Sequence, residues 1–182
     1  MNKYINLFFA GITSKENESI DGCQDAFQVK ENCIAIADGV SQSLYPKVWA
    51  DLLVEHFCNS PDEIKEDWQK WLVPIQEEWL KTVTKRIETA KINKNPTWID
   101  NQNRLTQFIS AKSTLVGLQI KDNQMYISMI GDSCLFIWQD NKFKECIPYN
   151  SSSEFNDSPV FLQDLQKTIN LNRHSTRKTL IK

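Results

Sequence analysis

The sequence predicts an α+β fold in which helices pack against an antiparallel β-sheet. Short apolar runs that are typical of strands occupy residues 4–10, 26–29 and 33–38. Apolar residues at helical spacing then dominate between residues 43 and 110, and residues 113–147 return to short, partly alternating apolar runs. An order of strands, then helices, then a strand meander is typical of the α+β class.

The first predicted helix carries an apolar stripe from Leu44 to Phe57, with Ser43 as its candidate cap and Pro46 in its first turn. A capping box, Ser-Pro-Asp-Glu at residues 60–63, predicts the start of a second helix. A shorter helix is expected to follow the turn cluster at residues 93–97 and to end near Ser110.

A tryptophan-rich stripe between residues 64 and 87 includes Trp68, Trp71 and Trp79. Such a stripe could be a ligand surface, but its spacing follows one helix face and therefore favours core packing. Pro74 lies inside the stripe, and it is expected to kink the helix or to split it, because proline removes a helix hydrogen bond.

The strand meander is predicted at residues 113–120, 125–130, 134–138 and 143–147. Asp122-Asn123 and Asp140-Asn141 mark two of its turns.

Length and composition fit one globular domain, which we place at residues 1–165, followed by a polar basic tail at residues 166–182. The net charge of −2 argues against a general nucleic-acid binder. No apolar run approaches the roughly 20 residues that span a bilayer, so no membrane partner is predicted. The five cysteines are scattered without a C-x-x-C pair, which fits free thiols in the cytoplasm and makes a zinc site improbable.

Acidic residues stand at the ends of several predicted strands. Asp38-Gly39 ends the run at residues 33–38, Asp25 precedes the strand at residues 26–29, and Gly131-Asp132-Ser133 follows the strand at residues 125–130. A carboxylate at a strand end is either a turn residue or a metal ligand, and Asp-Gly by itself is more often a turn. The presence of several such acids shifts the balance towards a metal site.

Four motifs together resemble the metal-dependent PP2C (PPM) protein phosphatases, in particular a bacterial branch. They are Gln24-Asp25-Ala26, the strand that ends in Asp38-Gly39, Ser113-Thr114, and Gly131-Asp132-Ser133. The order and the gaps match the family over residues 5 to about 162.

The resemblance implies an antiparallel β-sandwich flanked by helices, and metal-dependent hydrolysis of phosphoserine and phosphothreonine in a phosphoprotein substrate. It implies two Mn²⁺ or Mg²⁺ ions, with Asp38 and Asp25 as the catalytic residues. Asp38 would bridge the metals, the carbonyl of Gly39 would bind one of them, and Asp25 would hold metal-bound water. Asp132 matches an aspartate that contributes to a weaker third metal position.

Three departures from the family pattern bear on activity. Gln24 stands where many relatives have glutamate, and Ile20 stands where relatives have a phosphate-binding arginine. The later Asp-Gly and Asp-Asn motifs are missing, since the only acid after Asp157 is Asp164. We therefore expect the C-terminal part of the fold to be incomplete, with an unpaired sheet edge that permits self-association. The alternative function is a catalytically impaired relative that binds a phosphoprotein or another partner.

Overall fold

The computed structural model describes residues 22–122, 124–149, 151–154, 161–163 and 175–180. The strand predicted at residues 4–10 and the acids Asp157 and Asp164 lie outside these ranges. In chain order, the elements are β1 (Ala26–Lys30), β2 (Cys33–Ala37), α1 (Pro46–Asn59), α2 (Glu63–Glu66), α3 (Trp68–Ile92), α4 (Thr97–Thr106), β3 (Lys112–Ser113), β4 (Leu115–Lys121), β5 (Gln124–Ile130), β6 (Leu135–Gln139), β7 (Lys142–Ile147), a 3₁₀ helix (Ser152–Glu154), β8 (Leu162–Gln163) and β9 (Ser175–Leu180).

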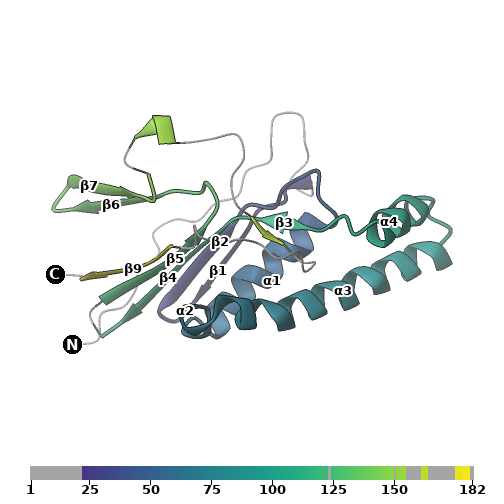
Figure 1. Cartoon of the computed structure of the whole chain (residues 1–182), viewed down its shortest axis with the longest axis horizontal. Helices are drawn as coiled ribbons and strands as arrows, with labels where there is room; N and C mark the ends of the chain where they lie inside the picture. Colours follow the sequence, from purple (N-terminus) through teal and green to yellow (C-terminus); the bar gives the residue numbers. More distant parts are fainter. Residues whose placement is uncertain (1–21, 123, 150, 155–160, 164–174, 181–182) are drawn as a thin grey trace.

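Five of the strands form one antiparallel sheet in the order β1-β2-β4-β5-β9 (Figure 1). Strands β3 and β8 pair with each other, and β6 and β7 form a hairpin. The turn of this hairpin consists of Asp140 and Asn141, which both have positive φ angles, as a tight two-residue turn requires. The predicted α+β class is confirmed.

One face of the five-stranded sheet carries the larger hydrophobic core. Helix α1 packs on β1, β2 and β4, and its Trp49 and Phe57 are completely buried. The Phe57 ring lies so close to β4 that a Cβ atom added to Gly117 would be 2.4 Å from it. A glycine is therefore needed at the centre of β4, because the close-packed interior leaves no room for a side chain. Helix α3 packs against α1 and α4 and extends this layer.

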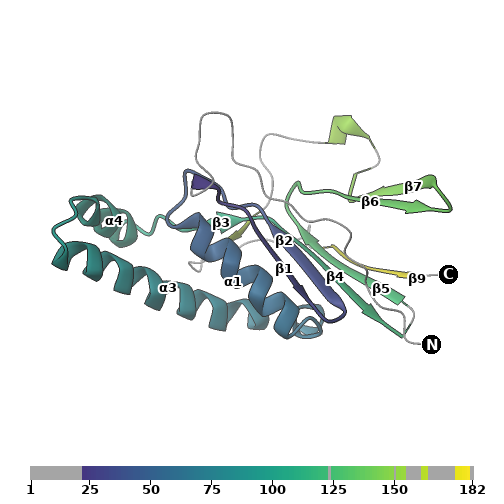
Figure 2. The same ribbon diagram turned by 180° about the vertical axis from the view of Figure 1, so that it is seen from behind.

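The opposite face carries a second apolar cluster. Val116, Ile127 and Met129 of the sheet are buried there together with Ile147 of the β6–β7 hairpin. The two views place the hairpin on the side of the sheet away from α1 and α3 (Figures 1 and 2). The hairpin thus forms a second β layer over this face, in the manner expected of a sandwich. Three apolar side chains nearer the β1 edge are 37–43% exposed: Phe27, Val29 and Ile36.

The start of α1 differs from its prediction. Pro46 does lie in the first turn, but the residue at the N-cap is Tyr45, with a φ of 49°. The predicted cap, Ser43, accepts a hydrogen bond from the Lys112 amide at 3.1 Å instead. The Tyr45 hydroxyl accepts one from Asn101 Nδ2 at 3.1 Å. Contacts with distant segments, rather than a local cap, therefore fix the entry to this helix.

The capping box predicted at residues 60–63 is wrong, because Ser60 ends α1. The Ser60 amide donates to the carbonyl of His56 at 3.0 Å, as the C-cap of that helix. Helix α2 begins at Glu63, and Asp62 at its N-cap makes no side-chain capping bond.

Helix α3 is continuous through Pro74. Of the two outcomes expected at this proline, a kink or a split, the split is therefore excluded, and the kink stays a prediction. The interruption lies earlier, at Asp67, whose carboxylate accepts hydrogen bonds from the amides of Gln69 and Lys70, each at 3.1 Å. This is the side-chain cap that starts a helix. The core role of the tryptophan stripe is confirmed, since its buried members include Trp71 and Trp79.

The strand predicted at residues 113–120 is divided at Thr114 into β3 and β4. Within the segment predicted to be a polar basic tail, residues 175–180 form β9, which pairs with β5. This pairing was not predicted from the sequence. In the described ranges, no helix is both long and apolar enough to cross a membrane.

Candidate functional site

Asp25 and Asp38 lie side by side at one end of the five-stranded sheet. The last pair of the β1–β2 ladder is Ala26 with Ala37, so each aspartate stands one residue beyond it. Both alanines are buried in the core on the helix side. Because side chains alternate between faces, the two aspartates belong to the face away from the helices.

Thr114 and Gly131 lie at the same end of the sheet as Asp25 and Asp38, next to the ends of β4 and β5. The β4–β5 ladder ends at Leu115 with Ile130, and these two residues follow just beyond that pair. The Thr114 amide donates to the Asp38 carbonyl at 3.0 Å, and the Asp38 amide donates to Thr114 Oγ1 at 3.1 Å. The backbone of Asp38 is therefore held by two reciprocal hydrogen bonds with one residue.

The hydroxyls of the Ser-Thr motif add further contacts. Ser113 Oγ donates to the Asp38 carbonyl at 2.8 Å. Thr114 Oγ1 lies 2.8 Å from Ser133 Oγ, and since it already accepts from Asp38 it can donate its own proton to that serine. Gly131 has a φ of +106°, and a Cβ atom there would be 2.5 Å from the Thr114 methyl. Asp38, the Ser-Thr motif and the Gly-Asp-Ser motif are thus one connected unit.

Gly39 brings the Gln24-Asp25 segment and the start of α1 together. A Cβ atom on Gly39 would lie 2.7 Å from the Gln24 carbonyl oxygen and 3.0 Å from that of Pro46. The Gln24 side chain accepts a hydrogen bond from the Lys47 amide at 3.2 Å. Gln24, which replaces the glutamate of many relatives, therefore binds a free amide in the first turn of α1.

Three oxygen groups in this unit are suited to a cation. Asp25 is half-buried and forms no hydrogen bond or ion pair with any other described residue. The Gly39 carbonyl likewise accepts no hydrogen bond from the described part of the chain, and the Asp38 side chain is exposed. The Asp25 carboxylate is therefore open to a cation, because none of the other described residues occupies its oxygens. Carboxylate and carbonyl oxygens are the ligands that Mg²⁺ and Mn²⁺ prefer, so these residues fit such an ion.

Asp132 lies at the same end of the sheet, one residue beyond Gly131, and is half-buried. The described ranges nevertheless contain no cluster of three or more Asp, Glu, His or Cys side chains that could hold a metal. Of the four predicted ligands, Asp25, Asp38 and Gly39 are therefore brought together, whereas Asp132 stays peripheral to them. The metal role of each remains a prediction.

Two thiols lie beside the Gly-Asp-Ser motif. Cys134 Sγ donates a hydrogen bond to the Asp132 carbonyl at 3.5 Å. Burial, together with the charge of the neighbouring Cys146 thiol and a hydrogen bond with it, raises the pKa of Cys134 to about 11. Cys33 and Cys58 form another pair, in the core. Burial raises the pKa of Cys58 to about 12, and it also raises the pKa of Cys33.

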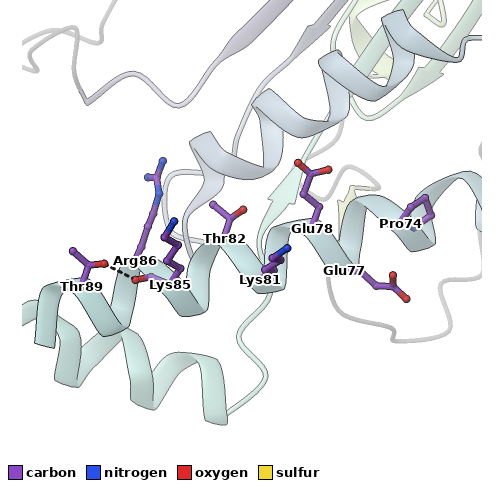
Figure 3. A pocket seen from close by; sticks show the side chains of 8 residues that line it. All are labelled: Pro74, Glu77, Glu78, Lys81, Thr82, Lys85, Arg86 and Thr89. Carbon is purple, nitrogen blue, oxygen red and sulfur yellow. Dashed lines mark hydrogen bonds between the residues drawn. The ribbon is translucent and has the colours of Figure 1, made fainter. Parts of the chain in front are cut away.

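A groove of about 850 Å³ runs along α3 (Figure 3). Its lining comes from residues between Pro74 and Thr89 of this helix alone. The charges there have both signs, for example Glu77 and Lys81. Because the groove contains none of the predicted site residues, we place the functional site at the sheet end.

A sequence model of the family described as protein phosphatase 2C matches residues 16–179, which is most of the chain. The chain belongs to the protein phosphatase 2C family. Among curated proteins, no sequence matches it.

One solved phosphatase structure shares its fold, and two others are more distantly similar. The photosystem II phosphatase PBCP has 15% sequence identity and a TM-score of 0.54, over 89% of this chain and 56% of PBCP. This protein phosphatase 2C chain thus spans just over half the length of that relative. The *Mycobacterium tuberculosis* phosphatase PstP/Ppp has 17% identity and a TM-score of 0.40, over 75% and 50% of the two chains. A PstP catalytic domain in complex with two manganese ions has 17% identity and a TM-score of 0.43, over 80% and 54%.

The sequence reading of this protein phosphatase 2C site missed two contacts. It included Ser113 and Thr114 as a motif but did not predict that both bind the backbone of Asp38. It also did not predict that Gln24 would bind the Lys47 amide. A β-branched or hydroxyl residue next to a strand gives no local sign of such a partner, because the partner is some 75 residues away in the chain.

Proposed function

We propose that this chain provides the metal-binding end of a protein phosphatase site that hydrolyses phosphoserine and phosphothreonine esters in a phosphoprotein. The observation that carries the proposal is the placement of Asp25 and Asp38, each one residue beyond the Ala26–Ala37 pair at one end of the sheet. Membership of the protein phosphatase 2C family supports the reaction class. We propose Mn²⁺ or Mg²⁺ as the cofactor.

In this proposal, Asp25 and Asp38 hold the cation through carboxylate oxygens, and the Gly39 carbonyl supplies a third oxygen. A bound divalent cation supplies an activated water for attack on phosphorus and neutralises charge on the phosphoryl oxygens. Ser113 and Thr114 fix the Asp38 backbone through the bonds described above, so that its carboxylate is held in place before a ligand arrives. Asp132 would join from the periphery of the same sheet end.

A second candidate function is a non-catalytic module that binds a phosphoprotein through this surface. It is favoured by the number of acids in the site. Two carboxylates balance the charge of one divalent cation, whereas a two-metal site requires more. Within the described ranges no third acid joins Asp25 and Asp38.

The test is an assay of the purified chain, residues 1–182, with manganese and a phosphothreonine peptide, alongside calorimetry with manganese alone. Asp38→Asn is expected to abolish both manganese binding and phosphate release. Asp140→Asn is the matched control, because Asp140 lies exposed in the turn of the hairpin, and asparagine tolerates its positive φ. This variant should behave as the wild type.

The outcomes separate the two candidates. Turnover that needs manganese and Asp38 supports the phosphatase. Manganese binding that needs Asp38 but gives no phosphate release supports the binding module. Equal manganese affinity in the wild type and in Asp38→Asn would overturn the site itself.

A further inference from the structure

Two half-buried thiols, Cys134 and Cys146, meet at the base of the β6–β7 hairpin. In the hairpin register Phe136 pairs with Cys146, and Leu135 pairs with Ile147. Cys134 precedes Phe136 by two residues, so it lies on the same face of the hairpin as Cys146 and is its diagonal neighbour. Cys146 is also one of the neighbouring groups that raise the pKa of Cys134, in keeping with this placement of the two thiols.

We propose that Cys134 and Cys146 form a reversible intramolecular disulfide when a hydroperoxide oxidises the protein, and that this bond displaces Asp132. Neither the family nor the proposed phosphatase reaction requires these thiols. The displacement of Asp132 matters for metal binding only if the proposed function is correct, whereas the disulfide itself does not depend on it.

The reaction consumes one hydroperoxide. The sulfur of one thiolate attacks the peroxide, the O–O bond breaks, and a sulfenic acid and one water (or alcohol) are formed. The second thiol then attacks the sulfenic sulfur, the S–O bond breaks, and water leaves as the S–S bond forms. In sum, two thiols lose two protons and two electrons, and the peroxide is reduced. An added dithiol reverses the change by exchange.

When the disulfide forms, we expect Cys134 to move rather than Cys146. A disulfide brings the sulfurs to about 2.05 Å, which is closer than hydrogen-bonded thiols. Cys146 is held within β7 by its pairing with β6, whereas Cys134 lies before β6 begins, in the segment that follows Gly131-Asp132-Ser133. Oxidation also removes the S–H group that donates to the Asp132 carbonyl. Both effects act on the backbone of Asp132.

The chain contains a second thiol pair that serves as an internal comparison. Cys33 and Cys58 are both buried in the core, and each thiol donates to an oxygen atom: Asn32 Oδ1 for Cys33 and the Gln28 carbonyl for Cys58. A hydroperoxide reaches half-buried thiols more readily than thiols in a packed core. Burial raises the pKa of Cys134 as it raises that of Cys58, so the thiolate is disfavoured in both pairs. We therefore expect the hairpin pair to react slowly but, because of its better access, before the core pair.

Peptide mapping tests the disulfide directly. The reduced full chain is treated with hydrogen peroxide, and the remaining thiols are blocked before digestion with trypsin. Cleavage after Lys121, Lys142, Lys144 and Lys167 places Cys134 in peptide 122–142 and Cys146 in peptide 145–167. We expect these two peptides to be linked and the link to disappear with dithiothreitol. The number of free thiols should fall from five to three, because two of the five are oxidised.

Cys134→Ser and Cys146→Ser should each abolish the link, and Cys23→Ser, at another half-buried thiol, should leave it intact. The proposal would be overturned if Cys134 and Cys146 both stayed free at a peroxide dose that oxidises Cys33 or Cys58. A link between other cysteines would overturn it as well.

Calorimetry with manganese tests the effect on Asp132. We expect oxidised protein to bind manganese about tenfold more weakly than reduced protein. The reason is that loss of a partner that orients a metal ligand typically weakens metal binding by at least this factor. Equal affinity of the two forms would overturn the coupling to Asp132. A reduced protein that binds no manganese at all would instead count against the proposed function, while the peptide map would still decide the disulfide.

Discussion

The amide of Asp38 donates a hydrogen bond to the hydroxyl of Thr114 at 3.1 Å, and the amide of Thr114 returns one to the carbonyl of Asp38 at 3.0 Å. These two residues are 76 positions apart in the chain. The chain at the end of β2 is thereby held to the chain at the start of β4, just beyond the last residue pair of their ladder.

Replacement of Thr114 by valine keeps its shape but removes the hydroxyl. The Asp38 amide then loses its acceptor, and a donor left unpaired in a partly buried position costs about 1–3 kcal/mol. We expect this loss in urea denaturation, together with weaker manganese binding. Thr114→Ser keeps the hydroxyl and should retain most of the manganese affinity. Wild-type affinity in Thr114→Val would show that this bond does not position Asp38.

Gly39→Ala is expected to separate the two aspartates. The new methyl group would be 2.7 Å from the Gln24 carbonyl oxygen, so the segment that carries Asp25 must move away from Asp38. Overpacking of this kind typically costs about 1–3 kcal/mol. Calorimetry should show reduced manganese affinity in a variant whose circular dichroism still reports a folded chain. A folded variant with unchanged affinity would mean that Asp25 is not a ligand.

Two tryptophans of opposite exposure test the assignment of the core. Trp71 in α3 is 3% exposed, whereas Trp138 in β6 is 60% exposed. Trp71→Ala should lower the free energy of unfolding by about 3–5 kcal/mol, as large aromatic truncations in cores do. Trp138→Ala should change it by less than about 0.5 kcal/mol, as a surface substitution. Similar losses in both variants would contradict the assignment.

Asp62 predicts a pH dependence of stability. Hydrogen bonds from Lys65 and Lys121, at 2.9 and 3.0 Å, lower its pKa to about 2. A carboxyl whose pKa is lowered by folding stabilises the protein above its unfolded pKa of about 3.9, and this contribution is lost as the pH falls towards 2. Because the side chain is 50% exposed, we expect less than about 1 kcal/mol.

The measurement compares wild type with Asp62→Asn in urea at pH 6, 4 and 2. The difference between their free energies of unfolding should shrink across this range, and 1 M NaCl should reduce it at pH 6. A difference that stays constant with pH would show that the Asp62 ion pairs do not contribute.

Periodicity was enough to predict the elements whose hydrophobic pattern is strong. The stripe that includes Trp71 and Trp79 was assigned to the core, and both are buried, because one helix face must meet the sheet wherever the helix begins. The residues that cap the helices were not predicted correctly. Ser60 is a good N-cap residue in isolation, but it ends α1, and the cap of α3 is Asp67. Several residues nearby can cap a helix, and packing decides among them.

The long-range pairing of β9 could also not be predicted from the sequence. The segment of β9 has five polar residues in the run Ser175–Leu180 and no apolar alternation, yet it pairs with β5 along its whole length. Its partner lies about 50 residues earlier, and nothing local encodes that choice. The placement of Asp25 and Asp38 at one end of the sheet could be predicted for the opposite reason. Asp25 and Asp38 flank strands that are adjacent in sequence, so a single hairpin brings them together.

The turn of the β1–β2 hairpin determines how Asp25 and Asp38 are placed relative to each other. Residues Glu31 and Asn32 connect β1 to β2 at the end of the strands opposite Asp25 and Asp38, and Glu31 has a φ of 51°. Asn32 is anchored to β4, since its carbonyl accepts from the Ile120 amide at 2.9 Å. A slip of one residue there would turn one aspartate towards the helices while its neighbour stayed on the other face. The relative placement of the two carboxylates is therefore set some five residues away, by the length of the turn at the far end of the hairpin.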